Sequence, residues 1–111
     1  MTLFAVPQGD KRSRRPVGYV LGGTWPVAVL NDHHGAQVAQ QVAVRLKKVL
    51  DAHGWTMVEA SRRTGVDRLT ITRVLGGQVW PDLLTIATLE KTLDVDLWPG
   101  RNPGNPSEKG D

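Results

Sequence analysis

Residues 56–81, TMVEASRRTGVDRLTITRVLGGQVWP, contain two short helix patterns separated by a tight turn. Thr56 and Glu59 have the spacing of a capping box, in which the hydroxyl accepts the backbone N–H of the glutamate and the carboxylate reaches back. Gly65 supplies the left-handed conformation that ends many helices. The first helix is therefore expected to begin at Thr56 and to end near Thr64.

A second helix is expected over residues 67–76. It begins with Asp67, a favoured N-cap residue, and two glycines follow its end. At about 100° per residue, one side of this helix is apolar and the other is mixed. The apolar side, expected in the core, contains Ile71, Val74 and Leu75. The outward side contains Leu69, Thr72 and Arg73.

These residues resemble the Xre-type, phage-repressor-like (Cro-like) helix-turn-helix family, and the resemblance extends to both sides. VRLKKVLDAHGWT (44–56) is similar to that family's first helix. Pro81 with DLLTIATLEKTLDVDLW (82–98) is similar to its fourth helix and the start of a fifth. The resemblance covers about residues 38–98. It implies an all-α, five-helix repressor-like domain that binds duplex DNA.

Three positions differ from residues that are frequent in the family. Met57 stands where the family often has a glutamine that meets a phosphate, and methionine cannot donate that hydrogen bond. Leu50 replaces a frequent arginine and Ser61 a frequent alanine, and both changes are compatible with packing. Thr56 is a candidate phosphate contact, because helix N-termini favour anions; its other reading is a cap alone.

The resemblance places the helix over 67–76 in the major groove of DNA. Arg68 and Arg73 can pair with guanine edges or hold phosphates, and Leu69 can meet a thymine methyl group or be an ordinary surface leucine. Gln78 and Trp80 follow in a loop that runs beside a sugar-phosphate backbone in this family, although Trp80 also suits a place in the core. The predicted DNA-binding residues are Thr56, Arg68, Leu69, Thr70, Thr72, Arg73, Gln78 and Trp80.

The positive charge is concentrated in the N-terminal two thirds of the chain. The 111 residues carry a formal net charge of +3. Basic residues crowd the N-terminal KRSRR cluster (residues 11–15) and the helical region up to Trp80, whereas acidic residues prevail after Pro81. This distribution favours a polyanionic partner, with a solvated helix surface as the plainer alternative.

Four regions are expected from the placement of glycine and proline. Residues 1–16 form a basic disordered arm, 17–35 a β-hairpin and loop, 36–98 the helix-turn-helix domain, and 99–111 a disordered tail. The Gly22-Gly23 pair is the expected hairpin turn, and Pro26 restricts the second strand to an edge. The first helix should run to about His53, with Val38, Val42, Leu46, Val49 and Leu50 on its apolar stripe. The fourth should bury Leu83, Ile86, Leu89 and Leu93, and Trp55 and Trp98 are also expected to be buried.

Several function classes find no support in the sequence. Cysteine is absent, and adjacent His33 and His34 do not converge on one ion, so no metal site is expected. No cofactor motif and no catalytic arrangement occurs at interpretable spacing, which predicts that the protein is not an enzyme and needs no cofactor. No apolar run suits a signal peptide or a membrane helix, and we expect a cytoplasmic protein.

The sequence thus predicts a sequence-specific transcriptional regulator whose partner is double-stranded DNA. Because one recognition helix reads only a few base pairs, a homodimer on a pseudo-palindrome is expected, with the hairpin as candidate dimer contact. The alternative is a protein-binding antitoxin or adaptor module on the same fold, in which the hairpin edge pairs with a partner.

Overall fold

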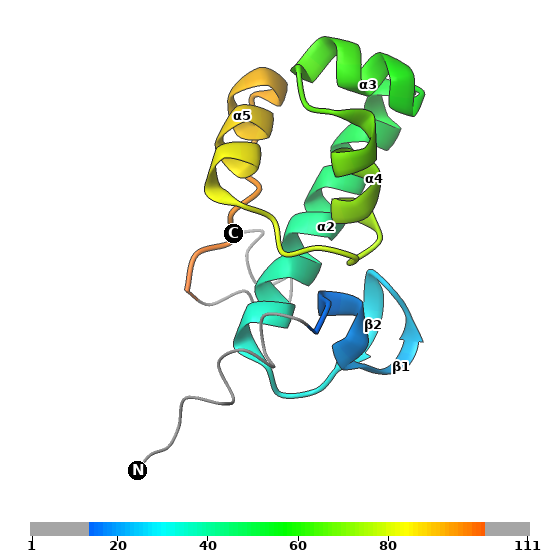
Figure 1. The fold of residues 1–111 in the computed structure, drawn as a ribbon, viewed down its shortest axis with the longest axis vertical. Coiled ribbons are helices and arrows are strands. Elements are labelled where there is room, and N and C mark those ends of the chain that lie inside the picture. The colour runs from blue at the N-terminus through cyan, green and yellow to red at the C-terminus, as the bar shows by residue number, and fades with distance from the viewer. Residues whose placement is uncertain (1–13, 102–111) are drawn as a thin grey trace.

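A computed structural model describes residues 14–101, in which α-helices predominate and a two-stranded antiparallel hairpin precedes them (Figure 1). One long helix, α2, runs through the molecule. The hairpin lies beside its N-terminal half, and the shorter helices pack around its C-terminal half. In chain order the elements are the 3-10 helix η1 (Pro16–Tyr19), strands β1 (Val20–Thr24) and β2 (Val27–Leu30), and helices α2 (His34–His53), α3 (Met57–Thr64), α4 (Arg68–Leu75) and α5 (Leu83–Leu93).

Helix α2 is set by a cap at each end and by an apolar stripe. Its N-cap is His33, whose Nδ1 accepts a hydrogen bond from Ala36 N at 3.0 Å, and Gly54 ends it in the left-handed conformation at φ 71°. Val42, Leu46 and Leu50, each four residues apart, are buried. The prediction of a helix ending at His53 is confirmed. No helix in residues 14–101, α2 included, combines the length and apolarity needed to cross a membrane.

Helices α3 and α4 begin where the sequence predicts. Thr56 Oγ1 accepts from Glu59 N at 3.1 Å, and Asp67 accepts from the backbone N–H groups of Leu69 and Thr70. Gly65 separates the two helices with φ 78°. The core lies between these helices, α2, α5 and the C-terminal segment. Its buried members are Val42, Leu46, Leu50, Ala60, Val66, Ile71, Val74, Ile86, Leu89, Leu93 and Leu97.

The expected fifth helix is not formed within the described residues. Asp94 adopts the left-handed conformation at φ 56° and ends α5. The Glu90 carboxylate then accepts from the backbone N–H groups of Leu97 and Trp98, at 2.8 and 2.9 Å, so those groups are held by a side chain and not by a helix. Leu97 is fully buried in the core. The fold therefore has four α-helices in residues 14–101 where five were predicted.

Three apolar positions depart from the predicted burial. Leu83, assigned to the buried stripe of α5, is 84% exposed, because it occupies the first turn of that helix, where the core is already closed by Ile86. Trp98 is 54% exposed and only borders the hollow lined by Val42 and Ile86. Trp55 is only half-buried, at the edge of the core.

The hairpin forms, but its turn is not at the glycine pair. The strands pair antiparallel with Thr24 opposite Val27, so that Trp25 and Pro26, joined by a cis peptide bond, make the turn. Gly22 and Gly23 lie within β1. The prediction was wrong because it placed Pro26 in a strand; in the turn, its missing N–H leaves no gap in the ladder.

Candidate nucleic-acid interface

Helix α4 presents a mixed polar and apolar face to solvent. Arg68, Leu69, Thr72 and Arg73 are exposed. On the opposite side Ile71 and Val74 are buried in the core, as the helical periodicity predicts. Thr70, also a predicted contact, is only half-exposed and lies between the two sides. Four exposed side chains thus form the outward face of α4: Arg68, Leu69, Thr72 and Arg73.

The guanidinium groups of the two α4 arginines are unpaired in the described part of the chain. Within residues 14–101, neither Arg68 nor Arg73 forms a side-chain hydrogen bond or an ion pair. The Thr72 hydroxyl donates to the Arg68 carbonyl oxygen at 3.0 Å, a bond inside the helix that leaves the guanidinium unaffected. Five N–H donors per guanidinium are therefore directed to solvent on the same face as Leu69.

Both arginines of α3 are paired with a carboxylate of the same helix. Arg62 donates through Nε and Nη2 to the two carboxylate oxygens of Glu59, and Arg63 Nε donates to Glu59 Oε2 at 2.6 Å. The hydrogen bond from Arg62, followed by that from Arg63, holds the pKa of Glu59 below its usual value. The same bond raises the pKa of Arg62. Glu59 therefore pairs with its own helix, and does not reach back to Thr56 as the capping-box pattern predicts.

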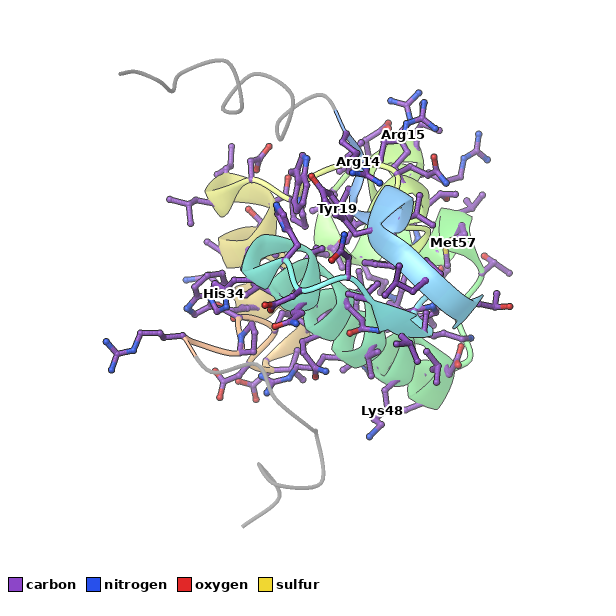
Figure 2. The ribbon with its side chains drawn as sticks, turned by 90° about the horizontal axis from the view of Figure 1, so that it is seen from below. Arg14, Arg15, Tyr19, His34, Lys48 and Met57 are labelled. Atoms are coloured by element: carbon purple, nitrogen blue, oxygen red, sulfur yellow. The ribbon has the colours of Figure 1, made fainter. Side chains whose placement is uncertain are left out.

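The start of α3 combines a cap with a residue that faces inward. Thr56 is exposed, and its hydroxyl oxygen already accepts from Glu59 N. Met57 is half-buried against the core, at the edge of the molecule seen in Figure 2. Met57, at the position where the family often has glutamine, therefore packs against the core. Thr56 is left as the exposed polar side chain that could contact a phosphate at this helix end.

The loop after α4 holds the N-terminal segment. Arg15 Nη1 donates to Gln78 Oε1, Trp80 Nε1 donates to the Arg14 carbonyl oxygen at 3.0 Å, and Val17 N donates to Gly77 O at 2.9 Å. The ring of Trp80 is half-buried. Gln78 and Trp80 thus already bind residues 14 and 15, and the plainer reading of Trp80, a structural one, is the one its contacts favour.

Arg14 and Arg15 lie next to the predicted site. Figure 2 shows both residues on the side of the molecule opposite Lys48. Arg14 Cζ lies 4.5 Å from the centre of the Tyr19 ring. Through Gln78, Arg15 is brought to the C-terminal end of α4. The sequence signal was the basic KRSRR cluster, but spacing along the chain does not tell where such a cluster meets the fold; its first three residues, 11–13, lie outside the described residues.

Of the two adjacent histidines, His33 serves the fold. His33 caps α2 and stacks on Tyr19, with ring centres 4.1 Å apart. His34 is exposed in the first turn of α2. Residues 14–101 contain no group of three or more histidine and carboxylate side chains that could hold a metal ion.

Comparison with known protein families matches residues 46–97 to the helix-turn-helix family. Comparisons with curated proteins and with solved structures gave no match. The matched stretch begins within α2 and includes all of α3, α4 and α5.

Proposed function

Residues 46–97 are a helix-turn-helix domain of the Xre/Cro type, which implies DNA binding, and from this premise we propose that the protein is a sequence-specific transcriptional regulator. Its partner is duplex DNA, and α4 is its recognition helix. Such a helix enters the major groove, whose base edges carry distinct donor and acceptor patterns.

The observation that carries this proposal is the free outward face of α4. Guanidinium groups recognise the O6 and N7 atoms of guanine through two parallel hydrogen bonds, and this requires that no carboxylate of the protein competes for them. Arg68 and Arg73 meet that requirement within residues 14–101. Leu69 lies beside them and suits a thymine methyl group, and Thr72 contributes a hydroxyl group.

Contacts to the DNA backbone come from the neighbouring elements. Thr56 stands at the N-terminus of α3, where backbone N–H groups favour a phosphate. Arg15 lies at the other end of the face through its bond to Gln78. In this arrangement Gln78 and Trp80 act by holding the N-terminal segment in place, and Thr70 supports the face from the rim of the core. Contacts of this kind fix the position of α4 but carry no sequence information.

Two copies of the chain are required for useful specificity. One recognition helix reads only a few base pairs, and a two-fold dimer doubles the site on half-sites about one helical turn apart. We therefore propose that the protein binds a pseudo-palindrome as a homodimer.

Selection of bound duplexes from a random pool tests the function. The wild-type protein should enrich a two-fold symmetric sequence, and a variant with Arg68→Ala and Arg73→Ala should enrich none. A salt titration should give a linear decrease of log K with log salt, with a slope of about −0.9 for each neutralised phosphate. Failure to enrich any sequence, together with a flat salt dependence, would show that the domain does not read DNA.

The second candidate is a protein-binding antitoxin or adaptor module. It is favoured by the exposed edge of the hairpin, which suits strand addition by a partner. Binding of that kind buries main-chain groups and does not require counterion release, so its salt dependence is expected to be shallow.

A further inference from the structure

The C-terminal end of α4 is completed by a residue from a distant part of the chain. The last four carbonyl groups of an α-helix have no partner inside the helix and need one elsewhere. Here the backbone N–H groups of residues 76–78 donate to the carbonyl oxygens of residues 72–74. The fourth carbonyl oxygen, that of Leu75, accepts from Trp25 Nε1 at 3.1 Å. The turn of the hairpin therefore closes the end of α4 (Figure 1).

The indole ring of Trp25 also packs against the loop that follows α4. Gly77, in that loop, is buried and has φ 67°. A Cβ atom on Gly77 would lie only 2.6 Å from Trp25 Cε2. Glycine at this position therefore allows both the left-handed backbone conformation and the close approach of the ring.

Trp25 is itself held in place by the long helix α2. Gln40 Nε2, from α2, donates to the carbonyl oxygens of Pro26 and Ala28 at 2.8 and 2.7 Å. The hairpin thus links α2 to the end of α4. It lies outside the stretch that matches the helix-turn-helix family, residues 46–97.

The end of α4 is where accurate placement matters most for reading a base pair. Arg73, a proposed base contact, lies in the last turn of α4. Two parallel hydrogen bonds between a guanidinium group and a guanine edge require a fixed direction as well as a fixed distance. A phosphate contact is mainly a charge attraction and tolerates small displacements. A shift of this helix end should therefore reduce the preference for one sequence more than the affinity for any sequence.

We propose that Trp25 is a positioning residue for DNA recognition, which fixes the orientation of α4 so that Arg73 meets its base pair. Trp25 does not touch the DNA in this role, and acts through the Leu75 carbonyl group and Gly77. The inference rests on the proposed function, in which α4 is the recognition helix.

Binding of the full chain to two duplexes at one salt concentration tests this role, one enriched from the random pool and one scrambled. Trp25→Ala should lower the ratio of the two affinities about 10-fold, the effect of one mismatched base pair, and should change the Kd for the scrambled duplex by less than about 2-fold. Trp25→Phe keeps a ring but loses the donor to Leu75. Its affinity ratio should lie between those of Trp25→Ala and the wild-type protein.

Gly77→Ala disturbs the same contact from the other side. Its Cβ atom would displace the ring of Trp25, so the affinity ratio should fall, and the loss in the double variant should be smaller than the product of the two separate losses. Gly54→Ala is the matched control. Gly54 has a similar φ of 71°, but a Cβ atom there meets nothing within 4 Å. This control brings similar backbone strain and should leave the affinity ratio unchanged.

Hydrogen exchange in the free protein separates this inference from the proposed function. The N–H groups of residues 76–78 should exchange about 10-fold faster in Trp25→Ala than in the wild-type protein or in Gly54→Ala. Unchanged exchange would overturn the inference even if the protein reads DNA. Faster exchange with an unchanged affinity ratio would also overturn it, because Trp25 would then only stabilise the fold. A wild-type protein that enriches no duplex would overturn the proposed function and the inference together.

Discussion

Helices α3 and α4 are equal in length and each carries two arginines, yet their charges have different uses. In α3, Glu59 lies three and four residues before Arg62 and Arg63 and accepts hydrogen bonds from both. In α4 no carboxylate follows Asp67, whose own oxygens are turned to the helix N-terminus. The two helices therefore carry the same number of arginines, and they differ in whether a carboxylate of the protein already pairs with them.

The largest effect is expected from Arg73→Ala. It should cost about 1 to 3 kcal/mol on the preferred site and relax selectivity at one base pair, because a base contact is lost. Arg62→Ala is the matched control; it should weaken all sequences alike and by less, since Glu59 already shares its charge. Binding of both variants to a specific and a scrambled duplex at one salt concentration measures the difference. Equal losses on the two duplexes for Arg73→Ala would mean that α4 holds only the backbone.

The caps of the two helices should differ in stability. Asp67→Ala removes a carboxylate that accepts from two backbone N–H groups and should destabilise the fold by about 1 kcal/mol. Thr56→Ala removes a single hydrogen bond and should cost less. Chemical denaturation of the two variants checks the order. A larger loss for Thr56→Ala would show that α3, and not α4, depends more on its cap.

Leu69→Ala should alter recognition without altering stability. Its side chain is exposed, so the core is unaffected. Loss of a methyl contact in the major groove is expected to cost about 0.8 kcal/mol at one T·A pair. Competition between duplexes that differ only at that pair, with thermal unfolding in parallel, measures both quantities. A drop in the unfolding temperature would place Leu69 in the packing of the fold.

Replacing Glu59 by Gln should leave the arginines of α3 without a carboxylate partner, as those of α4 already are. With Arg62 and Arg63 released, binding to any duplex should strengthen a few-fold, and the salt slope should steepen by up to about 2. Asp51→Asn is the control, because it releases Lys47 from a similar exposed pair on α2. It changes the charge equally, on a different helix.

Lowering the pH should also release the arginines of α3 in the wild-type protein and strengthen its binding to DNA. The pKa of Glu59 lies below its usual 4.5 because Arg62 and then Arg63 donate to the carboxylate. A lowered pKa means that the pair is intact above that usual value and is lost only as the pH falls through the lowered one. Wild-type and Glu59→Gln affinities for a scrambled duplex should therefore differ at neutral pH and converge below pH 4.5. Convergence at higher pH would contradict the ion pair.

The parts of the fold that could be predicted are those that rest on local signals. The N-caps at Thr56 and Asp67, the stop at Gly65 and the buried face of α4 follow from residue type and spacing within one or two turns. The missing fifth helix depends on Glu90, seven residues away from the N–H group of Leu97 that it binds. Such a contact has no periodic signature.

The same reasoning applies to the site. Its outward residues on α4 follow from helical periodicity, which needs no knowledge of the rest of the chain. The contacts that join Gln78 to Arg15 and Trp80 to Arg14 each link residues more than 60 positions apart. The hairpin turn was misplaced for a related reason: Trp25 packs on Gly77, and only the assembled fold brings them together.

The continuity of α2 has a consequence for how this protein can be taken apart. The stretch that matches the helix-turn-helix family begins at residue 46, in the middle of a helix that starts at His34. The first half of that helix supports the hairpin through Gln40, and the second half supplies Leu46 and Leu50 to the core. A chimera that received only residues 46–97 would contain a helix cut open at its centre, with new unsatisfied N–H groups at the cut. The smallest transplantable unit is therefore longer than the matched stretch and includes α2 from its N-cap, His33.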